Sequence, residues 1–210
     1  MSDTIELIQF DWSGTLSDDR PTVYESHVRM CQYYGIESQK TIEEWYRTAT
    51  GIPRDYQKPG VTDSPEQIWN LYKKIFLEVL ADGIHPTIFP DVKDTIQELK
   101  AQGKKLVVIS SHPQKYLHQE AKMYGIIEYF DEIRGSIPFN KSTEIRAMYT
   151  RLGVHPDNTL YVGDMVSDIL AAREANVRSI ALTRGYHTQE KLQAYKPFFL
   201  WDDLSPIKDL

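Results

Sequence analysis

The stretch Ile8-Gln9-Phe10-Asp11-Trp12-Ser13-Gly14-Thr15-Leu16 decides the fold of this chain. Residues 5–10 form a short apolar run that predicts a strand, and the run ends in a single carboxylate, Asp11. A strand that gives way to a glycine-containing turn places this carboxylate at the carboxyl edge of a sheet, where open α/β proteins bind their ligands. The turn that follows offers backbone N–H groups and two hydroxyls to an anion. Taken alone, an Asp before a Ser-Gly turn is more often only the exit of a strand.

Three later segments support a chemical role for this turn. A second apolar strand, Leu106-Val107-Val108-Ile109-Ser110-Ser111, ends in hydroxyls. A lysine follows in the loop Pro138-Phe139-Asn140-Lys141-Ser142. A third strand, Leu160-Tyr161-Val162, leads into Gly163-Asp164-Met165-Val166-Ser167-Asp168, which carries a pair of carboxylates. Parallel strands end at one edge of a sheet, so these groups can converge on one site.

In this order the four segments resemble the motifs of the haloacid dehalogenase superfamily of aspartate-nucleophile phosphotransferases. Those motifs are a D-x-D-G-T-type loop, a strand ending in Ser or Thr, a Lys, and a strand followed by G-D-x-x-x-D. The resemblance covers essentially the whole chain. It implies that Asp11 is the nucleophile and that Ser110 and Lys141 bind the transferred phosphoryl group, which makes these three the expected catalytic residues.

The resemblance also implies a Mg²⁺ site and a substrate-binding loop. Its expected ligands are Asp11, the backbone carbonyl of Ser13, Asp164 and Asp168, because Mg²⁺ takes hard oxygen ligands. Asp168 lies one helical turn after Asp164, where it can reach a metal-bound water or fix Lys141. Without the other motifs, this pair would be interpreted as a helix N-cap and a first-turn acid. The expected substrate-binding residues are Ser13, Ser111 and His112, and a position on the loop surface is the alternative for His112.

Ser13 departs from the family pattern, because the phosphatases carry a second Asp there. That Asp protonates the leaving oxygen and then activates water, and positioned acid–base groups contribute roughly 10²–10⁴-fold. A Ser cannot do this, so a catalytically weak scaffold with a binding or regulatory role stays open as an alternative. The Asp-Trp-small-Gly-Thr loop also resembles phosphonoacetaldehyde hydrolases, which need a cap lysine. The available lysines are Lys40, Lys58, Lys73 and Lys74. Dehalogenases need no Mg²⁺, so the intact Gly163-Asp164 motif counts against that chemistry.

The pattern along the chain predicts an α/β fold, in which a Rossmann-like parallel sheet forms residues 1–16 and 86–210. Residues 17–85 are expected to form a helical insertion that resembles the family's C1 cap. It should hold two short helices in a hairpin, a loop over 53–63, and a long helix that begins with the capping signals Ser64, Pro65 and Gln67. Arg54, Tyr56 and Lys58 in the loop are candidates to recognise a substrate anion, although each taken singly is more often only part of a solvated loop. Further strands are expected at 129–133, 160–162 and 179–182, with an edge strand at 198–201.

Composition limits the possible partners and compartment. The 210 residues carry a net charge of −6 and a pI near 5.5, with no dense Lys/Arg block, which argues against nucleic acid. Cys31 is the single cysteine, so no intrachain disulfide can form. The acidic first residues lack the features of a signal peptide, and no apolar run is long enough to span a bilayer. The expectation is a cytoplasmic monomer or homodimer that binds a small phosphorylated substrate and no membrane.

Overall fold

The computed structural model describes residues 4–39, 41–48, 52–137 and 141–210. The chain divides into two compact units, which are described separately below. One unit contains the chain up to Asp18 together with Thr87–Leu210, and the other contains Asp19–Pro86. The first unit is the α/β core, and the second is a helical insertion that follows the first strand.

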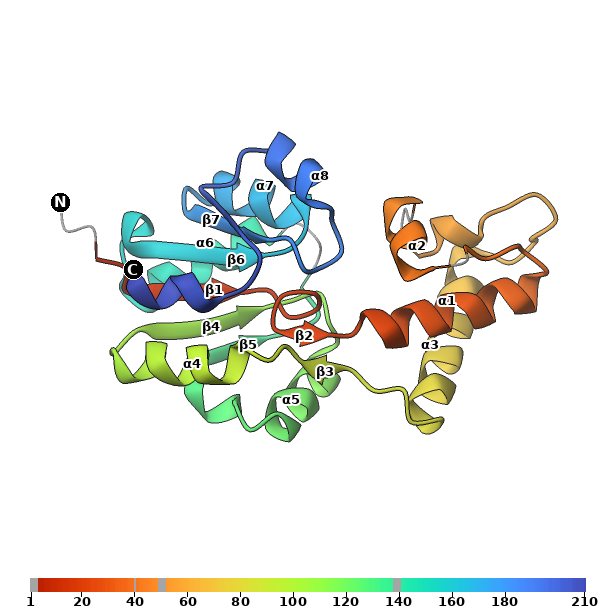
Figure 1. Ribbon diagram of the computed structural model, residues 1–210, viewed down its shortest axis with the longest axis horizontal. Helices are drawn as coiled ribbons and strands as arrows, with labels where there is room; N and C mark the ends of the chain where they lie inside the picture. Colours follow the sequence, from red (N-terminus) through yellow and green to blue (C-terminus); the bar gives the residue numbers. More distant parts are fainter. Residues whose placement is uncertain (1–3, 40, 49–51, 138–140) are drawn as a thin grey trace. The chain divides into compact units, whose positions relative to one another are not determined.

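The core contains a six-stranded sheet in which every neighbouring pair is parallel (Figure 1). The strands are β1 (Leu7–Phe10), β4 (Lys105–Ile109), β5 (Glu132–Arg134), β6 (Thr159–Gly163), β7 (Arg178–Leu182) and β8 (Phe199–Trp201), in the order β5-β4-β1-β6-β7-β8. The strand β1 therefore lies inside the sheet, and its neighbours β4 and β6 lead outward in opposite directions. The crevice beside β1 is the place where sheets of this topology bind ligands.

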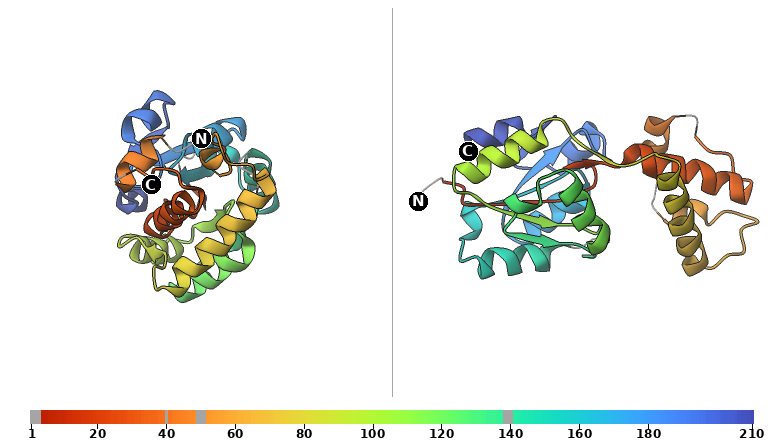
Figure 2. Two further views of the ribbon diagram at one scale, coloured as in Figure 1. Left: turned by 90° about the vertical axis from the view of Figure 1, so that its right-hand side faces the viewer. Right: turned by 90° about the horizontal axis from the view of Figure 1, so that it is seen from below.

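Helices cover both faces of this sheet (Figure 2). On one face, α4 (Val92–Ala101), α5 (Gln114–Met123) and the C-terminal turn η4 (Ser205–Asp209) pack on Phe10, Val108 and Val162. On the other face, α6 (Ser142–Arg151) and α7 (Val166–Glu174) pack on Leu7, Val107 and Tyr161, and α8 (Gln189–Ala194) packs near β8. Side chains that alternate along each strand are thus buried on both sides, which explains why the central strands are apolar throughout.

The predicted α/β fold class is confirmed, with some differences in the elements. The expected edge strand near residues 198–201 is present as β8. Residues 127–129 form the short helix η2 (Ile127–Tyr129), and β5 begins at Glu132, later than the strand expected at 129–133. A two-stranded antiparallel ribbon, β2 (Ser17–Asp18) with β3 (Thr87–Ile88), was not expected, because two-residue strands leave no periodic pattern. This ribbon flanks the insertion at both of its ends.

The insertion consists of α1 (Arg20–Tyr34), α2 (Ile42–Thr48), η1 (Arg54–Tyr56) and α3 (Pro65–Ala81). The expected capping box of α3 is present, because Ser64 and Gln67 exchange side-chain and backbone hydrogen bonds. Its α1 is longer than the short helix expected. The loop expected at 53–63 holds the one-turn helix η1, whose Tyr56 is buried against α1 and α3. Within the described residues, no helix combines the length and apolarity that crossing a bilayer requires.

Candidate active site

The acidic site residues gather where β1 and β6 end. Phe10 lies opposite Val162 in the parallel register, and the N–H of Asp11 donates to the Val162 carbonyl at 2.8 Å. Asp11 therefore leaves β1 beside the residues that lead into Gly163 and Asp164. Oxygens of Asp11, Asp164 and Asp168 all lie within 4.8 Å of one another, and the three residues are buried.

Lys141 joins two of these carboxylates. Its ammonium lies 2.8 Å from Asp11 Oδ2 and 2.8 Å from Asp168 Oδ1, and its side chain is only 3% exposed. Burial alone would disfavour the charged lysine, but the two carboxylates outweigh that cost, and the pKa of Lys141 is raised well above its usual value. Lys141 precedes α6, and the ring of Tyr161 lies 5.8 Å from its ammonium. The lysine therefore remains charged beside Asp11.

Asp164 is held by the turn after β1 and the loop after β7. The Thr15 hydroxyl donates to its Oδ1 at 3.0 Å, and the Tyr186 N–H donates to its Oδ2 at 2.7 Å. A Cβ atom at Gly14 would lie 2.7 Å from the Asp164 Cγ and 2.8 Å from the Tyr186 ring. Gly14 has a φ of +75°, so both its conformation and its neighbours require glycine. Burial, reinforced by Asp168 and Asp11, raises the pKa of Asp164.

Asp168 does not act as a freely solvated first-turn acid of α7. Its Oδ2 accepts from the Met165 N–H at 3.0 Å, while Oδ1 faces Lys141. Burial raises the pKa of Asp168, and Lys141 opposes that shift. Of the two roles open from the sequence, the geometry matches the fixing of Lys141.

The donor set fits a divalent cation. Three buried carboxylates face one ammonium, so two negative charges have no counterpart within this cluster when all four groups are ionised. Carboxylate oxygens are the ligands that Mg²⁺ prefers, and a dication would balance the excess charge. Asp11, Asp164 and Asp168 together supply the oxygens that could hold it, although Asp11 and Asp168 also contact Lys141 and Asp164 also accepts from Thr15 and Tyr186. An ion of this kind would neutralise charge on a substrate's phosphoryl oxygens.

The other predicted site residues occupy the same edge of the core. Ser110 is buried at the end of β4, and its Oγ accepts from the His112 N–H at 3.2 Å. This leaves the Ser110 hydroxyl proton available to a ligand. Ser13 is half-buried in the turn after Asp11, where it forms an isolated bridge with Ser17. Ser111 is exposed.

The candidate anion-binding residues of the insertion are not equivalent. Arg54 and Lys58 are exposed, as expected of a recognition loop. Tyr56 is buried and its hydroxyl lies 3.0 Å from His27 Nδ1, so the prediction that it recognises an anion is wrong. Burial raises its pKa, in keeping with a role in packing. Lys40 lies outside the described residues.

Two groups of contacts at this edge were not foreseen from the sequence. In the first, Glu120 on α5 accepts from the Trp12 indole N–H at 2.7 Å and lies 3.0 Å from His112 Nε2. In the second, the Arg184 guanidinium donates to the Thr15 carbonyl at 2.7 Å and also contacts Asp91. The contacts of Trp12 with Glu120 and of Arg184 with Thr15 and Asp91 join residues 108, 169 and 93 positions apart, which no local sequence pattern records.

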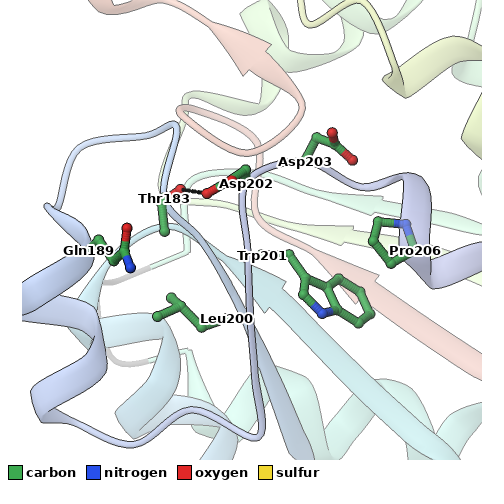
Figure 3. Close-up of a pocket in the computed structure, with 7 residues that line it drawn as sticks. All are labelled: Thr183, Gln189, Leu200, Trp201, Asp202, Asp203 and Pro206. Carbon is green, nitrogen blue, oxygen red and sulfur yellow. Dashed lines mark hydrogen bonds between the residues drawn. The ribbon is translucent and has the colours of Figure 1, made fainter.

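A separate surface pocket of about 410 Å³ lies beside β7 and β8 (Figure 3). Its lining includes Trp201, Asp202 and Asp203, and the Thr183 hydroxyl donates to Asp202 at 2.6 Å. None of the predicted catalytic or metal residues lines it. Two exposed carboxylates would repel an anionic phosphate ester, so this pocket is not the expected substrate site.

Comparison with known proteins agrees with this geometry. Residues 8–182 match the family described as haloacid dehalogenase-like hydrolase. The chain belongs to the haloacid dehalogenase-like hydrolase family. The matched residues include every motif of the site, from Asp11 to Asp168. The prediction of a hydrolase of this family is thereby confirmed.

Relatives within the family cover nearly the whole chain. The phosphoglycolate phosphatase of Vibrio parahaemolyticus is 28% identical over 98% of this chain and 96% of its own length. That of Vibrio cholerae is 27% identical over 99% of this chain and 97% of its own. Among solved structures, a predicted phosphoglycolate phosphatase from Haemophilus somnus superposes with a TM-score of 0.81 at 25% identity, covering 100% of this chain and 98% of that one.

Proposed function

We propose that this chain is a Mg²⁺-dependent phosphatase that hydrolyses a small phosphate monoester through an aspartyl phosphate on Asp11. The observation that carries the proposal is the buried cluster in which Asp11 lies 2.8 Å from Lys141 and within 4.8 Å of the other two carboxylates. An ion pair alone could be structural. Two uncompensated carboxylate charges at the ligand-binding edge of a sheet, in a chain of this hydrolase family, favour a cation and a phosphoryl group.

The proposed reaction has two displacements at phosphorus. An Asp11 oxygen attacks phosphorus, the bond to the ester oxygen breaks, and that oxygen takes up a proton as the alcohol leaves. Water then attacks the same phosphorus, loses a proton, and the bond to Asp11 breaks, which regenerates the carboxylate and releases phosphate. Lys141 offsets charge on the phosphoryl oxygens in both steps, and the Ser110 hydroxyl donates to one of them.

Substrate selection is assigned to the helical insertion, which we propose acts as a C1-type cap. Its support is its place in the chain, because it begins just after the turn that carries Asp11 and is flanked by the ribbon of β2 and β3. Exposed Arg54 and Lys58 suit a substrate that carries a second anionic group. The Vibrio relatives are named for such a substrate, so 2-phosphoglycolate is the first compound to test.

The phosphonatase alternative has weaker support. An imine-forming lysine reacts as the neutral amine, which burial favours. Lys58, Lys73 and Lys74 are all exposed in the insertion, so none of them has that setting. Phosphate ester hydrolysis is therefore preferred over cleavage of a carbon–phosphorus bond.

The experiment measures phosphate release from 2-phosphoglycolate, acetyl phosphate and 4-nitrophenyl phosphate at millimolar Mg²⁺. We expect turnover of at least one ester, and its loss in Asp11→Asn, because the amide keeps the size of the side chain but is not a nucleophile. Asp94→Asn, an exposed change on α4, is the matched control. Intact mass should show a phosphoryl adduct on the wild type and none on Asp11→Asn. If neither adduct nor turnover appears in a folded wild type, the chain is instead a binding or regulatory scaffold.

A further inference from the structure

The proposed hydrolysis needs a proton donor and acceptor that the turn after Asp11 lacks. Trp12, Ser13, Gly14, Thr15 and Leu16 include no group that titrates near neutral pH. Lys141 and Asp168 are engaged with each other, and Asp164 is held by Thr15 and Tyr186. A group outside these elements must therefore move the protons.

The pair of His112 and Glu120 meets this need. His112 stands two residues after Ser110 at the end of β4, and its backbone N–H donates to the Ser110 hydroxyl at 3.2 Å. Its Nε2 lies 3.0 Å from Glu120 Oε1, and the two side chains are 11% and 13% exposed. Partial exposure allows the imidazole to exchange protons with a ligand or water. The ring of Tyr116 lies 6.5 Å from the imidazole, and Glu120 is the acid that faces it.

Glu120 also ties this pair to the nucleophile turn. Its second oxygen, Oε2, accepts from the indole N–H of Trp12 at 2.7 Å, and Trp12 directly follows Asp11. The indole is fully buried and stacks on Tyr124 with ring centroids 5.9 Å apart. The buried and stacked indole therefore offers Glu120 a hydrogen-bond donor on the residue next to Asp11. One carboxylate thus links the turn of the nucleophile to the imidazole.

The hydrogen bond fixes which imidazole nitrogen can act. An ionised carboxylate only accepts, so Nε2 carries the proton that points at Glu120. In the neutral ring Nδ1 is then the basic nitrogen, and in the charged ring it is the donor. His187, in the loop after β7, has different contacts: its Nδ1 accepts from the Val166 N–H at 2.9 Å and its Nε2 lies 2.9 Å from Lys191. Burial lowers the pKa of His187 to about 4, which keeps it neutral.

We propose that His112 is the general acid and base of this hydrolase and that Glu120 is its positioning residue; this inference rests on the proposed function. In the first step Asp11 attacks phosphorus, the ester bond breaks, and the leaving oxygen takes the proton from Nδ1 of the imidazolium. In the second step the neutral Nδ1 takes a proton from the attacking water as the bond to Asp11 breaks. The imidazolium is thereby restored, and the protons balance over one turnover.

The first test compares single variants by pre-steady-state release of nitrophenolate from 4-nitrophenyl phosphate at fixed Mg²⁺. His112→Gln should lower the steady-state rate roughly 10²-fold or more while a burst remains, because an aryl oxide leaves without an acid but water still lacks its base. It should also lose the acid limb of the pH–rate profile. His118→Gln, an exposed change on α5, is the matched control and should retain the wild-type rate. A His112→Gln rate within threefold of wild type overturns the proposal.

Glu120→Gln separates positioning from packing. The amide oxygen can still accept from Trp12, but its NH₂ then faces His112 Nε2 and forces the proton onto Nδ1, which removes the base. We expect a similar loss of kcat with unchanged KM and melting temperature, whereas Glu128→Gln, an exposed change, should have no effect. A loss that only tracks a fall in melting temperature overturns the positioning role.

Two further readouts distinguish chemistry from damage to the fold. Added imidazoles of rising pKa should restore the activity of His112→Ala in the order of their basicity. A variant that is inactive because its loop is misfolded would not respond to them. Ser13→Asp in the His112→Gln background should restore turnover by supplying a carboxylate beside Asp11. If neither rescue occurs while Asp11 still forms its phosphoryl adduct, the His112 proposal alone fails. If the wild type shows neither the adduct nor turnover, the proposed function fails and this inference with it.

Discussion

Replacing Lys141 by methionine should destabilise the core far more than an ordinary lost ion pair. Lys141 and Lys100 each approach an aspartate at 2.8 Å, but their side chains are 3% and 34% exposed. At that distance the Coulomb attraction of one pair is about 1.5 kcal/mol in water and about 6 kcal/mol at an effective dielectric constant of 20. Desolvation offsets much of the larger figure, and breaking a buried pair costs about 3–5 kcal/mol because the remaining charges stay buried.

The assay is urea denaturation in EDTA, followed by circular dichroism. We expect Lys141→Met to lower the free energy of unfolding by about 3–5 kcal/mol and Lys100→Met by less than about 1 kcal/mol. Adding Asp168→Asn to Lys141→Met should recover part of the loss, since one of the repelling carboxylates is removed. Mg²⁺ should stabilise Lys141→Met more than the wild type, because the ion then meets three carboxylates without a competing ammonium. Equal losses for Lys141→Met and Lys100→Met would refute the electrostatic account of the site.

Three further predictions concern the metal ligands, the glycine turn and the insertion. Millimolar Mg²⁺ should raise the melting temperature of the wild type, and Asp164→Asn should blunt that rise; identical shifts in both proteins would remove Asp164 from the metal site. Gly14→Ala should cost more stability than Gly103→Ala. Both positions have a positive φ, so both alanines carry a backbone strain of about 1–2 kcal/mol, but only the Cβ added at Gly14 would crowd Asp164. Equal melting temperatures of the two variants would contradict the crowding. Burial lowers the pKa of His27, so the folded insertion takes up a proton on this ring less readily than the unfolded chain, whose histidine titrates near about pH 6.5. Stability should therefore fall as the pH drops through that value, and His27→Gln should show a shallower fall in melting temperature between pH 7.5 and 5.5; parallel curves would exclude this contribution.

Three of the candidate site residues could be recognised in the sequence because each of them follows a short apolar strand directly. Each apolar run that ends in Asp, Ser or Gly-Asp marks the carboxyl end of a buried parallel strand, and such ends share one edge of the sheet. Asp11, Ser110 and Asp164 could therefore be assigned to the carboxyl edge of the sheet from the sequence alone. The capping signals of Ser64 and Gln67 were equally local, since the hydrogen bonds that begin a helix involve residues three positions apart.

Tertiary structure decided how those components are connected. The sequence left Asp168 open between meeting a metal-bound water and fixing Lys141, and the structure brings Asp168 and Lys141, 27 positions apart, to 2.8 Å. The structure exposes Arg54 but buries Tyr56, two positions later in the same loop, because η1 turns the tyrosine toward α1 and α3. Two residues of one short loop thus differ in exposure: Arg54 faces solvent and Tyr56 packs in the interior of the insertion.

The proposed pair of His112 and Glu120 shows most clearly what the sequence determined and what only the fold decided. The sequence alone determined that Ser13 cannot replace a carboxylate, since a hydroxyl does not titrate near neutral pH. Only the fold brought Glu120 to both Trp12 and His112, across 108 and 8 positions of the chain. Contacts of this kind depend on how α5 packs on the sheet, and packing is set by the summed shapes of many side chains rather than by any short motif.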